Sequence, residues 1–220
     1  MPQIHSRSRG PEAPATLVRV GRKSLRSVRE DAMHCRDCPL WRDATQTVFG
    51  EGRAHAPVML VGEQPGDQED LSGKPFVGPA GKILDRALDE LGVERASVYV
   101  TNAVKHFKFE QRGKRRLHKK PADVEIAACH QWLEREIALV QPHLIVALGA
   151  TAARSIFGKA TAIEKNRGHV IDTQTSGAAA DILVTIHPSF LLRMPPADKP
   201  AAFKRFVADL RLVLPYLKAA

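Results

Sequence analysis

The stretch GEQPGDQEDLSGKPFVGPAG, residues 62–81, decides the fold of this chain. It follows the apolar run PVMLV at residues 57–61, whose length and valines are typical of a buried strand. Gly62, Pro65 and Gly66 then end the strand, and Gly78-Pro79 opens a helical pattern. The stretch therefore predicts a strand, a loop and a helix, which is the repeating unit of an α/β sheet.

The loop within this stretch carries an unusual density of functional groups. Its acids, amide and ring are Glu63, Gln64, Asp67, Glu69, Asp70 and Phe76. Acids, an amide and a flat ring together favour recognition of a planar heterocycle, such as a flipped base, and chemistry on it. The alternative is a polar connection with an accidental excess of acids, and the loop's composition alone does not separate the two.

Three more apolar runs follow, at residues 98–104, 144–148 and 182–186. Helical patterns separate the runs: one apolar face is formed by Ile83, Leu84, Ala87, Leu88 and Leu91, and another by Trp132, Leu133, Ile137 and Val140 in the segment that Pro121 opens. Strands that alternate with helices predict a three-layer α/β/α sandwich with a central, mainly parallel, four-stranded sheet.

Polar residues follow each of these runs. Asn102 ends the second run, Thr151 follows the third, and His187-Pro188-Ser189 follows the fourth. Ligands of such sheets bind beyond the carboxyl ends of the strands, so we expect these residues to meet the loop at one rim. Taken singly, Asn102 is equally typical of a strand-end cap and Phe76 of a core residue.

Length and composition bound the kind of protein. The 220 residues suit one domain, and residues 1–28 have the polar, basic composition of a disordered leader to a domain at 29–220. The net charge of +9 favours polyanionic partners such as nucleic acid. Because no apolar run is long enough to span a membrane and the N-terminus has no signal-peptide core, we expect a cytoplasmic or nucleoid-associated protein.

The three cysteines indicate a metal site. Cys35 and Cys38 form a C-x-x-C unit, and Cys129 is the only other cysteine. An odd count in a cytosolic context argues against a structural disulfide. The residues themselves leave zinc, an iron-sulfur cluster and a redox pair open.

Two of these motifs, GEQPG at residues 62–66 and HPS at residues 187–189, resemble the paired motifs of the uracil-DNA glycosylase superfamily. KPFVGPAG, TNAVKHFKF and LGATAA extend the resemblance from about Cys35 to the C-terminal helix. The chain is most similar to the iron-sulfur type, family 4, and within it to the X-type branch (UdgX), whose members become covalently attached to uracil-containing DNA. The resemblance implies a uracil-DNA glycosylase. Because extruding a base costs least from a single strand, we expect single-stranded DNA to be preferred to, or to equal, double-stranded DNA, and binding of one flipped base needs only a monomer.

The X-type assignment depends on the basic segment EQRGKRRLHKK at residues 110–120. Composition alone indicates a solvated loop or a phosphate-binding arm. The resemblance implies that Arg115-Arg116-Leu117-His118 carries a histidine, His118, that captures C1′ of the deoxyribose and leaves a stable DNA adduct without turnover. The expected contacts to the DNA backbone are Arg112, Lys114, Arg115, Arg116, Lys119 and Lys120.

The other roles follow from the same resemblance. Phe76 stacks on the extruded uracil, Asn102 reads its Watson-Crick edge, and His187 donates to its O2 as negative charge develops there. Glu63 orients or deprotonates His118, and Gln64 holds the base or the attacking group. Asp67 and Asp70 support the cationic sugar, while Gly62 and Ser189 complete the substrate-binding set.

The resemblance also implies a [4Fe-4S] cluster with a structural role. Family 4 uses four cysteines, and His106 stands here where the fourth is expected, so the predicted ligands are Cys35, Cys38, His106 and Cys129. His34 and His130 are the alternatives to His106. Three cysteines and one histidine also suit zinc.

Two other functions share the predicted fold and charge. One is a non-catalytic, metal-stapled DNA-binding module, and the other is a conventional glycosylase that releases uracil and leaves an abasic site. Composition does not discriminate between them, whereas the product of the reaction with DNA does.

Overall fold

The computed structural model describes residues 24–172 and 180–218. Its elements, in chain order, are α1 (Leu25–Met33), η1 (Pro39–Arg42), β1 (Val58–Gly62), α2 (Asp67–Ser72), α3 (Pro79–Glu90), η2 (Arg95–Ser97), β2 (Tyr99–Asn102), β3 (Phe109–Arg112), β4 (Arg115–His118), α4 (Asp123–Val140), β5 (Leu144–Leu148), α5 (Ala150–Phe157), α6 (Ile163–Asn166), β6 (Val170–Ile171), β7 (Asp181–Thr185), α8 (Pro188–Arg193), α9 (Lys199–Leu210), η3 (Arg211–Val213) and α10 (Leu214–Lys218). Among these residues, no helix has the length and apolarity needed to cross a membrane.

The main sheet has the strand order β2-β1-β5-β7-β6. The first four strands are parallel and correspond to the four predicted apolar runs, so the predicted α/β fold is confirmed. The two-residue strand β6 adds an antiparallel edge that was not predicted, because two residues are too few to form a pattern. Strand β2 is shorter than predicted, since it ends at Asn102 instead of continuing to residue 104.

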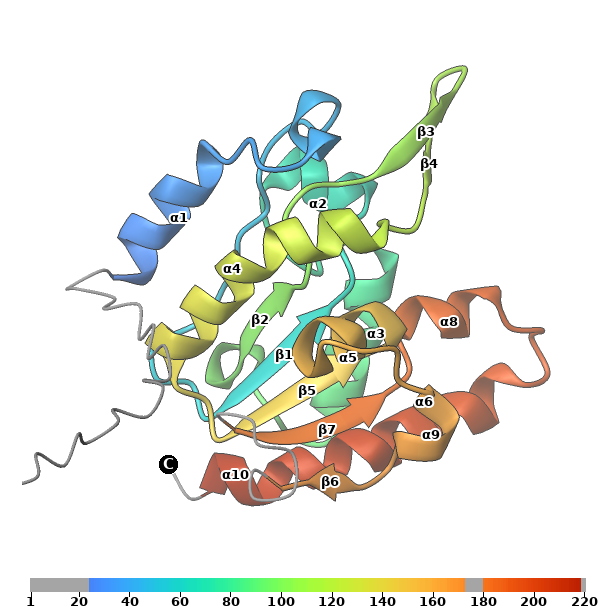
Figure 1. The fold of residues 1–220 in the computed structure, drawn as a ribbon. Helices are drawn as coiled ribbons and strands as arrows, with labels where there is room; N and C mark the ends of the chain where they lie inside the picture. The colour runs from blue at the N-terminus through green and yellow to red at the C-terminus, as the bar shows by residue number, and fades with distance from the viewer. Residues whose placement is uncertain (1–23, 173–179, 219–220) are drawn as a thin grey trace, which may run out of the picture.

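Helices cover both faces of this sheet (Figure 1). In β1, Val58 and Leu60 face a core cluster with α3, α8 and α9, whereas Met59 and Val61 face a second cluster with α4 and α5. All five residues of β1 are buried, as expected for a parallel strand covered on both sides. The four carboxyl ends of the parallel strands therefore lie at one edge of a rigid layer.

Helix α1 begins inside the segment that was predicted to be a disordered leader. Ser24 accepts a hydrogen bond from the backbone N–H of Ser27, which caps the helix, and Val28 is fully buried. Val28 and Ala32 pack with Cys129 and Trp132 of α4 in a third core cluster. Residues 24–28 are therefore not part of a disordered leader, and the rest of the predicted leader, residues 1–23, lies outside the described part of the chain.

The basic segment at residues 110–120 is mostly a β-hairpin, which corrects its prediction as a loop. Strands β3 and β4 pair antiparallel, with Arg112 opposite Arg115 and Phe109 opposite His118. Gly113 has a φ of 57° at the first of the two turn residues, a conformation that glycine adopts without strain. The hairpin projects from the body of the molecule, and it places His118 at its base (Figure 1).

Candidate active site at the carboxyl edge of the sheet

Gly62, Phe76 and Asn102 pack tightly together at the carboxyl ends of β1 and β2. A Cβ added at Gly62 would lie 2.3 Å from Oδ1 of Asn102 and 2.5 Å from Cζ of Phe76, so only glycine fits there. Asn102 is 2% exposed, and its Oδ1 is buried without a hydrogen-bond partner among the described residues. A buried, unpartnered acceptor is costly, and this one is satisfied if a ligand brings a donor.

The backbone at Phe76 is held in an uncommon conformation. Its φ is 55°, in the left-handed region that bulky residues rarely adopt. Gly81 permits this turn, because a Cβ there would lie 1.9 Å from the carbonyl oxygen of Phe76. The buried carboxylate of Glu69 accepts hydrogen bonds from the backbone N–H groups of Gly66 (3.1 Å) and Gly78 (2.8 Å), and so it ties the two ends of the loop together.

His187 borders the same pocket, with its ring centroid 5.9 Å from that of Phe76. The backbone N–H of Ser189 donates to Nδ1 of His187 at 3.2 Å, so the neutral ring carries its proton on Nε2. Burial, together with the nearby positive charges of His118 and Arg193, lowers the pKa of His187 to about 4. At neutral pH, His187 is therefore an uncharged donor. His187 is the N-cap of α8, and Ser189, predicted as a substrate contact, here bonds the His187 ring through its backbone N–H and its hydroxyl.

His118 reaches this edge from the last position of β4. Its Nε2 lies 3.0 Å from Nε2 of Gln64 and 3.5 Å from Oε1 of Glu63. The other oxygen of Glu63 accepts a hydrogen bond from the Thr151 hydroxyl. Burial lowers the pKa of His118, while the Glu63 charge opposes that shift. Because its pKa is lowered, the ring is largely neutral at pH 7. The side chain is half exposed, so the ring is also accessible.

Gln64 also holds the hairpin at its two ends. Its Nε2 donates to the carbonyl oxygens of Lys108 (3.1 Å) and Lys119 (3.0 Å), and its Oε1 accepts from the N–H of Lys108 (3.2 Å). Lys108 precedes β3 and Lys119 follows β4. The loop after β1 therefore fixes the base of the hairpin and the histidine that it carries.

Asp67 and Asp70, predicted to support a cationic sugar, both bind Arg116. Nε of Arg116 donates to Asp67 at 2.6 Å, and Nη1 donates to Asp70 at 2.5 Å. Asp70 is fully buried and also accepts from the backbone N–H of Thr45 (3.0 Å). The guanidinium of Arg116 lies over the rings of Phe107 and Phe109. Arg116 is thus turned toward the protein and does not project outward as predicted for a phosphate contact.

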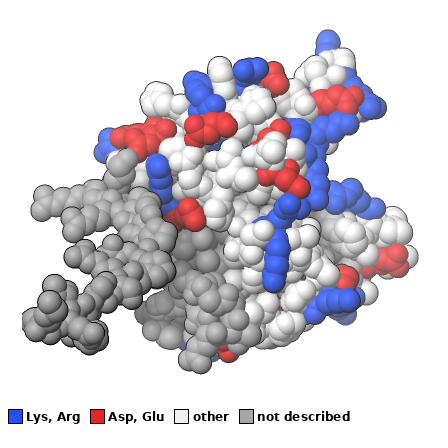
Figure 2. Space-filling model, in the orientation of Figure 1, with Lys and Arg blue, Asp and Glu red and all other residues white. Residues whose placement is uncertain are grey.

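The remaining predicted phosphate contacts differ in their partners. Glu110 pairs with Arg112 at 2.7 Å and with Lys119 at 2.5 Å. Lys114, Arg115 and Lys120 have no ion pair with another described residue, and Lys114 and Arg115 are exposed in the hairpin. Figure 2 shows basic side chains at the projecting hairpin and on the surface below it. This side of the molecule is suited to a polyanion.

The three cysteines gather around the contact between α1 and α4. Sγ of Cys35 accepts from Nε1 of Trp132 (3.3 Å), and Sγ of Cys129 accepts from the N–H of Lys105 (3.2 Å). Burial is the main cause that raises the pKa of Cys129 to about 12. The charges of Cys38 and Cys35 contribute to this rise, so the three thiols are close enough to interact electrostatically. His106 is buried and its Nε2 lies 2.9 Å from the Thr47 hydroxyl.

A fit to a single metal ion is not supported by this arrangement. Among the described residues, which include all four predicted ligands, no three His, Cys, Asp or Glu side chains converge as one ion requires. His130, one of the two alternatives to His106, instead contacts Ser155 (3.2 Å) and Glu134 (3.3 Å). The three thiols lie on one core cluster, and cysteine thiolates are the usual ligands of iron-sulfur clusters.

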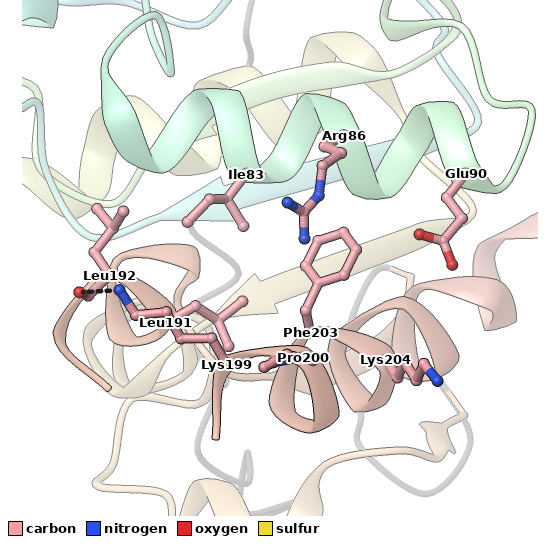
Figure 3. Close-up of a pocket in the computed structure, with 9 residues that line it drawn as sticks. All are labelled: Ile83, Arg86, Glu90, Leu191, Leu192, Lys199, Pro200, Phe203 and Lys204. Carbon is pink, nitrogen blue, oxygen red and sulfur yellow. Dashed lines mark hydrogen bonds between the residues drawn. The ribbon is translucent and has the colours of Figure 1, made fainter. Parts of the chain in front are cut away.

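A separate hollow of about 430 Å³ lies between α3, α8 and α9 (Figure 3). Arg86 reaches from α3 over the ring of Phe203 in α9, with the guanidinium carbon 3.6 Å from the ring centroid. Lys199 points toward α8 and donates to the carbonyl oxygen of Leu192 at 3.1 Å. None of the predicted site residues lines this hollow, and its wall carries no pair of catalytic groups.

Several residues near the site were not singled out in the sequence. Thr151 was noted only as a strand-end residue, although its hydroxyl holds Glu63. Glu69 was counted only among the acids of the loop, and the spacing Gly66-x-x-Glu69 is the signal for its capping role. Phe190 and Leu192 are 46% and 42% exposed on α8, directly after His187. Exposed apolar residues beside a motif have no periodic signature, so structure was needed to find them.

Fold and site together define an α/β protein whose aromatic, amide and histidine side chains meet at the carboxyl edge of its sheet. A family model described as the uracil DNA glycosylase superfamily matches residues 49–211, and the chain belongs to this superfamily.

Curated relatives agree with this assignment. A type-4 uracil-DNA glycosylase from Thermotoga maritima is 41% identical over 168 residues, covering 76% of this chain and 82% of the relative. A type-4 uracil-DNA glycosylase from Pyrobaculum aerophilum is 34% identical over 192 residues, covering 86% and 92%. The crystal structure of wild-type SMUG2 from Pedobacter heparinus matches with a TM-score of 0.51 at 13% identity, covering 73% of this chain and 77% of that one, and it supports the fold alone.

Proposed function

We propose that this protein is a uracil-DNA glycosylase that is captured covalently by its substrate through His118. The observation that carries the proposal is the buried, unpartnered Oδ1 of Asn102, which lies against Phe76 at the rim that also holds His187. Membership of the superfamily and the type-4 relatives supply the substrate class.

The pocket distinguishes uracil by its pattern of donors and acceptors. Oδ1 of Asn102 accepts from N3–H of uracil, and the amide nitrogen donates to O4. Cytosine presents an acceptor at N3 and a donor at N4, so both contacts fail and the oxygen stays unpaired. Phe76 stacks on the base, and the packed wall that it forms with Gly62 leaves little room for a 5-methyl group.

His187 stabilises the leaving base. As the bond between C1′ and N1 breaks, its electron pair moves onto the uracil ring and charge accumulates at O2 and N1. The neutral ring of His187 donates from Nε2 to O2, because Nδ1 already accepts from Ser189. A fixed donor in a buried pocket stabilises such charge without reorganisation.

Capture by His118 completes the reaction. The Gln64 amide nitrogen, which donates but cannot accept, lies 3.0 Å from Nε2 and shares one of its two protons between this nitrogen and a carbonyl oxygen. This contact favours the tautomer with the proton on Nδ1 and a lone pair on Nε2. After the ring turns from Gln64, this lone pair forms the bond to the cationic C1′, and the resulting imidazolium loses its Nδ1 proton to solvent. Glu63, 3.5 Å away, stabilises the positive charge that passes from sugar to imidazole. Asp67 and Asp70 contribute by anchoring Arg116.

The DNA-binding surface combines charge and apolar wedges. Lys114, Arg115 and Lys120 are available to bind phosphates. Arg112 and Lys119 can also bind phosphates if they give up their ion pairs with Glu110. Phe190 and Leu192 project next to His187, where an apolar side chain fills the gap left by an extruded base. Extrusion costs least from single-stranded DNA, so we expect uracil there to react most readily. One extruded base needs one chain, which is consistent with a monomer.

We further propose a structural [4Fe-4S] cluster held by Cys35, Cys38, Cys129 and His106. The support is the resemblance to family 4 and the gathering of three thiols on one core cluster. Such a cluster would tie the segment after α1 to α4 and to the turn after β2, and it supplies no electron to the reaction proposed here.

Covalent capture is tested on a denaturing gel with a single-stranded oligonucleotide that contains one uracil, beside a thymine control. Wild-type protein is expected to give a heat-stable shifted band with uracil only. His118→Ala is expected to lose this band while still releasing uracil, and Asn102→Ala is expected to lose at least about 100-fold of both signals.

The other outcomes identify the competing functions. Strand breakage after alkali without a shifted band, in wild type and His118→Ala alike, would mean a conventional glycosylase. Neither adduct nor breakage, together with equal binding of uracil and thymine DNA, would mean a non-catalytic binding module. An adduct that survives His118→Ala would move the nucleophile to another residue.

A further inference from the structure

Beneath Asn102 lies a fully buried ion pair that the reaction described above does not use. Nζ of Lys105 lies 2.5 Å from Oε2 of Glu136 in α4, and the side chains are 1% and 0% exposed. Glu136 also accepts from the backbone N–H of Gly50 (2.9 Å) and the hydroxyl of Tyr99 (2.9 Å). Burial and the Glu136 charge raise the pKa of Tyr99 well above its ordinary value.

Stability alone gives a weak reason for such a pair. Removing two charges from water costs several kcal/mol, and apolar residues of similar volume are often as stable or more stable than a buried ion pair. Leucine, valine and tyrosine fill comparable positions on this face of the sheet. The geometry around Lys105 points to a different use.

The ammonium group of Lys105 donates hydrogen bonds to three separate acceptors. Besides Glu136, it donates to the hydroxyl of Thr101 (2.7 Å) and to the main-chain carbonyl of Asn102 (2.7 Å). The Thr101 hydroxyl is in turn within 3.0 Å of both Glu136 oxygens. Lys105 therefore holds the last two residues of β2, Thr101 and Asn102, at the point where the strand ends.

We propose that Lys105 and Glu136 are positioning residues for base recognition. Lys105 holds the backbone of Asn102, and Glu136 holds Lys105, so that the unpartnered Oδ1 keeps its place in the pocket. A shift of about 1 Å in a recognition group is enough to cost about 100-fold in rate. This inference rests on the proposed function, because it assigns to Asn102 the recognition of the uracil edge.

A double-mutant cycle separates positioning from general stability. The paired variant Lys105→Met/Glu136→Leu removes both charges together, so it avoids leaving one charge buried. Single-turnover release of 5-fluorouracil, whose anion leaves more readily than that of uracil, keeps slow variants measurable. We expect the paired variant to lose about tenfold or more in rate with an unchanged Kd for the DNA, and to lose less than about twofold when Asn102→Ala is already present.

Tyr99→Phe is the matched control, because it removes one donor to Glu136 but leaves Lys105 on the carbonyl of Asn102. It is expected to lower the midpoint of urea unfolding with no change in rate. Equal losses in both backgrounds, an unchanged rate in the paired variant, or a loss in Tyr99→Phe as large as in the pair would overturn the inference. If the paired variant does not fold, Glu136→Gln takes its place in the same cycle. Failure of wild type to release any base would instead refute the proposed function.

Discussion

At the scale of single residues, burial prepares two histidines for opposite roles. The pKa values of His187 and His118 are both lowered, mainly because each ring loses solvent. His187 keeps a proton on Nε2 because Ser189 occupies Nδ1, so it donates a hydrogen bond. Nε2 of His118 lies 3.0 Å from the Gln64 amide nitrogen, which cannot accept a hydrogen bond, so the proposed mechanism places a lone pair there. In the proposed reaction, neighbouring hydrogen bonds, more than residue type, decide which ring acts as donor and which as nucleophile.

The lowered pKa of His118 sets the pH dependence of capture. Only the neutral ring is a nucleophile, so the adduct rate should be constant above pH 6.5, the ordinary pKa of histidine, and fall as the pH drops through the lower pKa of His118. Single-turnover adduct formation between pH 4.5 and 8 measures this profile. Uracil release by His118→Ala is the control and should stay constant until the pH approaches about 4, where His187 takes up a proton. An adduct rate still rising between pH 7 and 8 would contradict the assignment.

At the scale of elements, the β3–β4 hairpin is a positioned arm. Gln64 holds its two ends, and Arg116 fastens its second strand to Asp67 and Asp70. Asp70 is fully buried, which makes its pairing with Arg116 stronger than a surface ion pair. The basic hairpin thus contains residues of two kinds: Arg116 faces the protein, whereas Lys114 and Arg115 face solvent.

Arg116→Ala should release the arm from α2. We expect the adduct rate to fall by about tenfold or more, because His118 loses its fixed approach to the sugar, while uracil release by the pocket stays within about threefold. Arg115→Ala is the matched control in the same strand: it should weaken DNA binding and reduce its salt dependence, with the ratio of adduct to released base unchanged. The ratio is read on denaturing gels at saturating protein. Equal effects of the two variants would assign Arg116 to phosphate binding.

At the scale of the whole molecule, the three layers place the candidate active-site residues at the carboxyl edge of the sheet and the cysteines near α1. Helix α1 packs on α4 through Val28, Ala32 and Trp132, and the same cluster receives Cys35, Cys38 and Cys129. Lys105 joins the two regions, because its N–H donates to Cys129 while its side chain holds Asn102. The metal site proposed here is therefore a brace for the pocket, and its loss should act on folding.

Replacing His106 tests that brace. His106→Cys completes the four-cysteine set and should keep iron and sulfide content near that of wild type, whereas His106→Ala should lower both and reduce the thermal unfolding midpoint. His130→Ala and His34→Ala are the controls and should change neither. Iron and acid-labile sulfide are assayed on protein purified without oxygen. Loss of iron in His130→Ala with retention in His106→Ala would reassign the fourth ligand, and zinc in place of iron would replace the proposed cluster.

Much of the fold was predictable because its signals are local. Residues 57–81 carry a strand, a turn and a helix start within one window, and three further apolar runs repeat the pattern. Once the strands are parallel, topology places their carboxyl ends together, so the meeting of Gly62, Asn102 and His187 at one rim followed from chain order. The two-residue strand β6 and the start of α1 inside the leader lacked such a signal.

The sequence by itself thus determined the α/β class, the edge that carries the site and most residues at that edge. Only the tertiary structure decided which partners these residues take. Arg116 meets Asp67 and Asp70 across 49 and 46 positions of the chain, and Lys105 meets Glu136 across 31. No local pattern records a contact between residues so far apart, because such contacts depend on how the layers pack. The unpartnered Oδ1 of Asn102 is a property of the same kind, since it exists only where packing has excluded every other donor.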